Sequence, residues 1–208
     1  MKIWDLPTRL YHWLQALLFA LLALSGFLGT GPHEWFGLAL ATLVTWRVLW
    51  GFFGSETSRF HQFLRSPKTV ISYLKGEHSH HGVGHNPAGG WMVITLLSLI
   101  LAQCFVGLSM GGYLDPYVHD DSLLYDMDLL IFLHATFAYL LLACVVLHLS
   151  AITIYNLRGK SLVKAMFTGK QPKLVSTVRV FFRSNARAGF LLATIGGLVS
   201  VFLYPSFT

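Results

Sequence analysis

Charged residues and cysteines are scarce in this sequence. Only 12% of the 208 residues are Asp, Glu, Lys or Arg, whereas 54% are hydrophobic, and the mean hydropathy is +0.59. A soluble domain of this length cannot bury so much apolar surface, so the composition excludes the ordinary soluble classes and is typical of a bundle that folds in lipid. We predict an all-α integral membrane protein that forms one domain over residues 1–208.

The two cysteines, Cys104 and Cys144, both lie within apolar stretches. This placement argues against a disulfide framework and a cysteine-based metal site, and favours two small buried hydrophobic side chains. No CxxCH motif occurs, so covalently attached c-type haem is excluded. Nucleic-acid binding is excluded as well, because the net charge of +6 comes from basic residues between the apolar stretches and not from a basic, aromatic-rich patch.

Five apolar stretches approach the roughly 20 residues that are needed to cross a bilayer core of about 30 Å. Each of them must be helical, since lipid offers no partner for a free peptide group. The predicted transmembrane helices cover about residues 10–29, 33–53, 90–111, 129–155 and 186–205. Lys2 and Arg9 precede the first stretch as in a signal peptide, but its length and the presence of His12 favour a retained helix.

Basic and acidic residues are separated along the chain. Apart from Arg47 near the end of the second helix, every Lys and Arg lies in or beside segments 1–9, 54–90 and 156–185, and the intervening segments carry only acidic charges. Positive charge marks the cytoplasmic side, so we predict a multi-pass protein of the inner membrane with a cytoplasmic N-terminus and a periplasmic C-terminus. The acidic segment 115–128 either docks a basic periplasmic protein or is an ordinary solvated loop.

Four of the ten histidines lie in or at the ends of the predicted spans: His12, His33, His134 and His148. A polar side chain in a span is costly and marks a functional site by default, although a single one could serve an interhelical hydrogen bond. We interpret His61, His85 and His119, which lie outside the spans, as surface residues. The loop sequence HSHHGVGH at 78–85 could bind a metal, but its glycines favour a solvated loop.

The four histidines of the spans pair by depth in the membrane. His134 and His148 are 14 residues apart, which is four helical turns less about 40°, so they share one face and lie about 21 Å apart along the axis. The alternating direction of the helices places His12 with His148 on the inner side and His33 with His134 on the outer side. Two imidazoles from different helices, one on each face of a porphyrin, are the usual way to hold low-spin b-type haem in a bundle.

Iron with both axial positions filled binds oxygen and substrates poorly, so the predicted chemistry is electron transfer. The first four helices form the predicted haem-binding core. Gly26, 14 residues after His12, either lets the outer haem approach its helix or serves close helix packing. Arg47, 14 residues after His33, either faces a propionate of the inner haem or extends to the membrane surface.

Two further residues of the spans lie near the predicted haem positions. Gly37, one turn after His33, also allows close packing on the outer haem. Gln103 is the strongly polar residue of the third helix, and we predict that it makes a hydrogen bond between helices in preference to binding a quinone. The last helix has Gly196 and Gly197 and no histidine or acidic residue within the span, so we predict that it packs on the core or faces a partner.

Several sequence motifs resemble those of the bacterial b561-type cytochromes. They are WDLPTRLYHW at the start, TWRVLWGFFG at the end of the second helix, GHNPAGGW before the third, and the H-x13-H pair of the fourth. The resemblance covers about residues 1–170. It extends to the di-haem cytochrome b subunits of nickel-iron hydrogenases and the gamma subunits of formate dehydrogenases.

This resemblance implies two b haems, a quinone as redox partner, and axial ligand roles for His12, His33, His134 and His148. In one respect the sequence departs from the pattern, since His33 directly follows Pro32 at the start of its helix, whereas related subunits often place this ligand deeper. His119 is the alternative ligand if the outer loop folds back.

The leading hypothesis for function is a cytochrome that exchanges electrons between the quinone pool of a respiratory chain and a partner redox protein, such as a periplasmic cytochrome c or a dehydrogenase- or hydrogenase-type subunit. The alternative is a self-standing membrane enzyme such as a superoxide:quinone oxidoreductase. An anionic substrate would require a basic outer funnel, whereas the outer segments are acidic. A transporter or non-haem metal protein is a third class, which two histidine levels about 21 Å apart argue against.

Overall fold

The structure, a computed structural model, describes residues 1–77, 82–119, 121–171 and 179–203. His78, His80 and His81 of the predicted loop cluster lie outside the described residues. The elements in chain order are α1 (Leu6–Leu28), α2 (His33–Phe53), η1 (Glu56–Ser58), α3 (Phe60–Phe63), α4 (Pro67–Leu74), α5 (Pro87–Met110), η2 (Asp115–Tyr117), η3 (Leu123–Tyr125), α6 (Met127–Leu157), α7 (Leu162–Thr168) and α8 (Asn185–Leu203).

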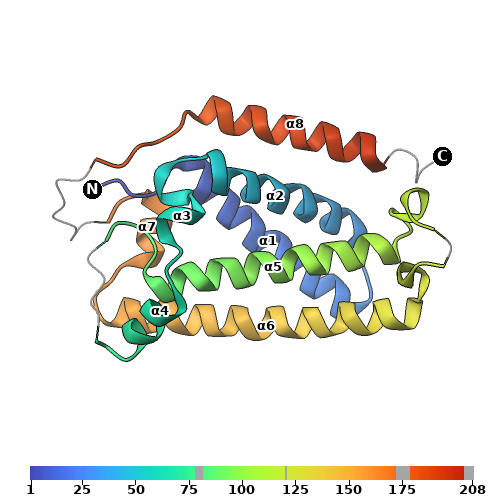
Figure 1. The fold of residues 1–208 in the computed structure, drawn as a ribbon, viewed down its shortest axis with the longest axis horizontal. Helices are drawn as coiled ribbons and strands as arrows, with labels where there is room; N and C mark the ends of the chain where they lie inside the picture. The colour runs from blue at the N-terminus through green and yellow to red at the C-terminus, as the bar shows by residue number, and fades with distance from the viewer. Residues whose placement is uncertain (78–81, 120, 172–178, 204–208) are drawn as a thin grey trace.

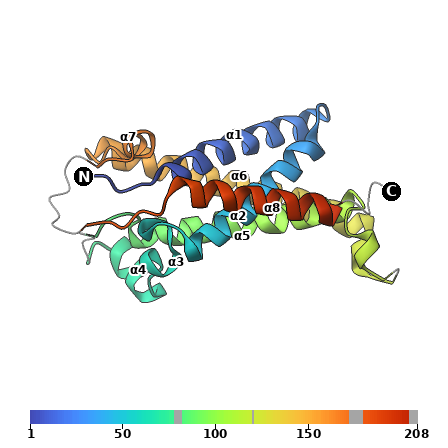
Figure 2. The ribbon, with the colours of Figure 1, turned by 90° about the horizontal axis from the view of Figure 1, so that it is seen from above.

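Five of the described helices, α1, α2, α5, α6 and α8, are long and apolar enough to cross a membrane. They run along the long axis of the molecule in both views (Figures 1 and 2). The short helices α3, α4 and α7 lie at the end that carries the N-terminus, called here the N-terminal end, and η2 and η3 lie at the other, called the distal end (Figure 1). The predicted helical membrane bundle is confirmed.

Three of these helices begin before the predicted apolar stretch because a side chain caps them. The Thr8 N–H donates to Asp5 Oδ1 (3.0 Å), so α1 begins at Leu6. The Gly89 N–H donates to the Asn86 side chain (2.7 Å), and α5 begins at Pro87. Asp126 caps α6 in the same way. Each cap satisfies an N–H group of the first turn, which has no partner within its own helix.

The long helices form two packed pairs, α1 with α2 and α5 with α6, and α2 also packs on α5. Buried side chains such as Val44, Leu97 and Leu141 fill the region between the pairs. Helix α8 packs mainly on α2, on the side that faces away from the interior of the bundle. There the Trp46 indole N–H donates to the Ala188 carbonyl (3.0 Å). The four helices α1, α2, α5 and α6 are therefore the ones that surround the interior, and α8 lies at its edge (Figure 1).

A buried polar network ties the N-terminal segment to the loop after α2. The Trp50 indole N–H donates to Asp5 Oδ2 (3.1 Å), and Thr8 and Ser58 share a hydroxyl hydrogen bond of 2.6 Å. The Thr57 hydroxyl donates to the Ile3 carbonyl (2.7 Å). These contacts explain the WDLPT motif as a device that fixes the start of α1 against the end of α2.

The prediction that His85 is a surface residue is correct only in part, because its side chain is half-buried. Its imidazole packs between the rings of Trp4 and Phe63, with centroid distances of 4.7 and 4.8 Å. The segment before α5 packs on the N-terminal residues, and this long-range contact covers part of the ring. His61 and His119 are exposed, as expected.

Candidate haem site

A short turn between α1 and α2 determines where His33 lies. Gly29 and Gly31 adopt φ values of +62° and +91°, which side chains rarely allow. The His33 N–H donates to the Gly31 carbonyl (2.9 Å). The chain therefore reverses within a few residues, and the first residue of α2 lies back against the last two turns of α1.

Two small residues of α1 receive the His33 imidazole. Ser25 Oγ lies 2.9 Å from His33 Nδ1, and the Ser25 side chain is only 7% exposed. A Cβ atom added to the next residue, Gly26, would lie 3.2 Å from His33 Cε1. Gly26 thus lies at the depth predicted for it, and its missing side chain leaves room for the imidazole itself.

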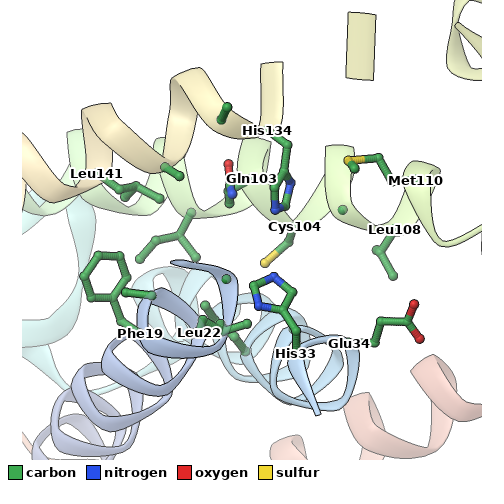
Figure 3. Close-up of a pocket in the computed structure, with 18 of the residues that line it drawn as sticks. Phe19, Leu22, His33, Glu34, Gln103, Cys104, Leu108, Met110, His134 and Leu141 are labelled. Carbon is green, nitrogen blue, oxygen red and sulfur yellow. The ribbon is translucent and has the colours of Figure 1, made fainter. Parts of the chain in front are cut away.

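His134 on α6 faces His33 across the bundle. The two ring centroids are 6.1 Å apart with an interplanar angle of 67°, and Figure 3 shows the imidazoles pointing toward one another from opposite sides. A Cβ atom added to Gly107 of α5 would lie 3.3 Å from His134 Cε1. His134 Nδ1 is buried and has no hydrogen-bond partner among the described residues.

The facing imidazoles line a cavity of about 350 Å³, called here the distal cavity, between α1, α2, α5 and α6. Its walls are mainly apolar, with Phe19, Leu22, Leu108 and Leu141 visible around the two rings (Figure 3). The glycines that line it are Gly26, Gly37 and Gly107. An apolar cavity with two convergent imidazoles is suited to a flat, largely apolar ligand that bonds through a metal.

Polar groups also line the distal cavity. The Gln103 side-chain oxygen is buried without a hydrogen-bond partner in the described chain, so the predicted bond between helices is not formed by this atom. The free thiol of Cys104 lies beside it (Figure 3). Glu34 lies at the rim next to Tyr113, whose pKa is raised by burial and by the Glu34 carboxylate.

The second histidine pair lies toward the N-terminal end. It is predicted from His12 on α1 and His148 on α6, and His148 is 14 residues from His134 along α6, or about 21 Å at 1.5 Å per residue. His12 Nδ1 and the side-chain oxygen of Gln15, one turn later, are both buried without a partner among the residues described. His33 and His134 therefore face each other at 6.1 Å, and the pairing of His12 with His148 by depth stays a prediction.

Arg47 lies at the depth of this second pair. Its side chain is 3% exposed, and its guanidinium lies over the rings of Tyr11 and Phe60, at 5.9 and 5.4 Å from their centroids. One terminal nitrogen has no hydrogen-bond partner in the described residues, and neither has the buried Tyr11 hydroxyl. Arg47 does not extend to the membrane surface, so the snorkelling alternative is wrong.

Sequence reasoning missed Ser25, which contacts His33, and Gly107, which lines the distal cavity. Ser25 could have been suspected, because a glycine- and proline-rich turn after it returns the chain to His33. Gly107 gave no such signal, since its helix carries no histidine within the span and its neighbour His134 belongs to the next helix.

Histidines paired between apolar helices are the arrangement by which membrane cytochromes b hold their haem. A family model described as Prokaryotic cytochrome b561 matches residues 3–169, and the chain belongs to this family. It is a multi-pass membrane cytochrome that binds haem b and transfers electrons, and the predicted resemblance to the bacterial b561-type cytochromes is confirmed. No curated protein and no solved structure matches the chain.

The residues present fit a haem at the distal cavity. A metal–imidazole bond is about 2 Å long. Adding the distance from ring nitrogen to ring centre on both sides, two imidazoles on one iron have centroids about 6 Å apart. The observed separation is 6.1 Å. The glycines beside both rings and the apolar walls of the cavity fit the same ligand.

Proposed function

We propose that the chain is a di-haem b-type cytochrome of the inner membrane that transfers electrons between the quinone pool of a respiratory chain and a partner redox protein. The observation that carries the proposal is the pair His33 and His134, which face each other at 6.1 Å across an apolar cavity. Bound haem would supply a one-electron couple, and His33 and His134 would hold it.

The chain's own residues have distinct tasks in this proposal. His33 and His134 hold one haem, and His12 and His148 hold the other about 21 Å away. The apolar walls of the distal cavity exclude water, and Gly26 admits the ring of His33. Arg47 supplies a buried cation, and one of its donor nitrogens has no partner among the described residues, which suits the carboxylate of a propionate.

The charge distribution supports an N-terminus in the cytoplasm. Segments 54–86 and 158–184 both connect helices at the N-terminal end and carry most of the basic residues, whereas the distal segments 29–32 and 111–126 contain no Lys or Arg. Positive segments remain on the cytoplasmic side. The distal cavity then opens toward the periplasm, where the acidic segment that includes Asp115 offers a surface to a soluble redox protein.

A separate partner protein completes the proposed electron path. The sequence contains no iron-sulfur motif and no nucleotide-binding motif, so we assign the chemistry on the aqueous side to a periplasmic cytochrome c or a dehydrogenase- or hydrogenase-type subunit. The quinone serves as the redox partner within the lipid.

The proposal is tested by counting haem in the full-length protein purified in mild detergent. Pyridine haemochrome and reduced-minus-oxidised spectra should give two non-covalent b haems per chain, one in His33→Ala and one in His12→Ala. His119→Ala is the matched control, because this histidine is exposed, and it should keep two. If His119→Ala loses a haem and His33→Ala keeps two, the ligand is His119 and not His33.

The quinone assignment is tested separately in liposomes. A water-insoluble quinol analogue should reduce the oxidised wild-type protein, and the chemically reduced protein should in turn be reoxidised by the quinone. Two haems without either reaction would keep the cytochrome but remove the quinone pool as its partner.

A further inference from the structure

Building on the proposed function, we propose that Ser25 is a positioning residue for the distal haem. Its hydroxyl holds His33 in the tautomer that has a proton on Nδ1, and so presents Nε2 to the iron. Through this bond Ser25 raises the affinity of the distal site for haem and lowers the reduction potential of that haem. This positioning residue belongs to α1, although the proposed ligand His33 belongs to α2.

The direction of the hydrogen bond follows from the contacts of Ser25. The hydroxyl has one hydrogen to donate, and its oxygen lies 3.2 Å from the Leu22 carbonyl of the preceding turn, which can only accept. The same oxygen lies 2.9 Å from His33 Nδ1. Because the hydrogen is committed to Leu22, the oxygen accepts from His33, and Nδ1 is the protonated ring nitrogen. The unprotonated Nε2 is then the atom that can bind a metal.

The turn between the helices supports this contact. Gly29 and Gly31 permit the sharp reversal, and the Thr30 N–H donates to the Ser25 carbonyl (3.2 Å), so the turn is bonded to the serine. Ser25 is 7% exposed. A buried hydroxyl with two partners cannot rotate freely, and the imidazole that it holds loses little freedom when it binds iron.

The distal pair is asymmetric in this respect. His134 Nδ1 has no hydrogen-bond partner in the part of the chain that the structure describes, and the same holds for His12 Nδ1 of the other pair. An acceptor on the far nitrogen makes an imidazole a stronger electron donor, which favours ferric over ferrous iron. The haem held by His33 therefore has a lower potential than it would have without Ser25.

The experiment uses the full-length protein with Ser25→Ala, Ser25→Thr and the control Ser109→Ala. Ser109 is also a buried serine near the distal end of a long helix, 4% exposed, and its hydroxyl donates to the Phe105 carbonyl one turn earlier (3.0 Å). It has no histidine partner among the described residues. Redox titration gives the two potentials, and the transfer of haem to apomyoglobin gives the rate of haem loss. The His33→Ala protein identifies which component belongs to the distal site.

In Ser25→Ala the distal haem should leave about 10- to 100-fold faster, the usual effect of removing the partner of a metal-bound histidine, and its potential should rise. Ser25→Thr should restore both values, and Ser109→Ala should change neither. The haem of His12 and His148 should remain, which shows that the variant has folded. Two haems with unchanged potentials and loss rates in Ser25→Ala would overturn the inference. A wild type without a distal haem would instead overturn the proposed function.

Discussion

A methyl group at Gly26 should weaken the distal haem site. A Cβ at this position would lie 3.2 Å from His33 Cε1, which is about 0.3 to 0.8 Å shorter than a comfortable contact between carbon atoms. The imidazole must move by a few tenths of an ångström or turn away. A haem-free protein can let the ring turn, but a protein with bound haem cannot, so the strain opposes binding only.

The size of the effect follows from the cost of overpacking, which is about 1 to 3 kcal/mol for one extra methyl group. At about 1.4 kcal/mol per factor of ten, the apparent affinity for the distal haem should fall about 5- to 150-fold. The gain in helix propensity from Gly to Ala is present with and without haem and therefore cancels. Gly107→Ala should behave similarly, because its Cβ would lie 3.3 Å from His134 Cε1.

The assay is haem content and the rate of haem transfer to apomyoglobin for Gly26→Ala, Gly107→Ala and the control Gly197→Ala. Gly197 lies on α8, away from the distal cavity, and a Cβ there would meet nothing within 4 Å. Wild-type haem content and loss rates in both cavity variants would refute the steric argument. If Gly197→Ala loses haem to the same extent, the losses in the cavity variants come from a general effect on the bundle.

Two further predictions concern the N-terminal end. Arg47→Gln should speed loss of the haem held by His12 and His148 about 10- to 150-fold, from about 1.5 to 3 kcal/mol for a charge-assisted hydrogen bond, and should leave the distal haem unchanged; equal loss of both haems would contradict this role. Burial and the hydrogen bond with Tyr155 (2.8 Å) raise the pKa of Tyr73 above its ordinary value of 10.0. The folded state thus holds the Tyr73 hydroxyl proton more tightly than the unfolded state does, so the melting temperature should fall as the pH rises above 10. The fall should be smaller in Tyr73→Phe than in the wild type. An equal fall in the melting temperatures of both proteins would contradict this prediction.

The bundle could be predicted from the sequence because lipid leaves an apolar chain few choices. A stretch of about 20 apolar residues must be helical there, and α2 begins at the predicted residue His33. The first residues of α1 and α5 are harder to predict, since Asp5 and Asn86 cap these helices before the apolar stretch begins. A hydropathy pattern does not reveal a capping residue, because that residue is polar and lies outside the apolar stretch.

The two histidine pairs could be predicted for a similar reason. Depth in the membrane is a linear function of position along a helix, so residue spacing alone places His33 level with His134. Spacing does not give the rotation of one helix against its neighbour. The contacts of Gly107 with His134 and of His85 with Trp4 depend on how separate segments pack, and they became apparent only with the fold.

The position of His33 at the start of α2 is best understood together with the turn before it. A ligand at a helix end would ordinarily be loosely held, since the first turn has few neighbours and unsatisfied N–H groups. Here Gly31 accepts the His33 N–H, Ser25 holds the imidazole, and Gly26 leaves room for it. The contacts that a deeper position would receive from its own helix come instead from α1. In the proposed distal haem site these contacts hold His33 in place despite its departure from the family pattern, and they make the proposed site dependent on the sequence of the α1–α2 turn.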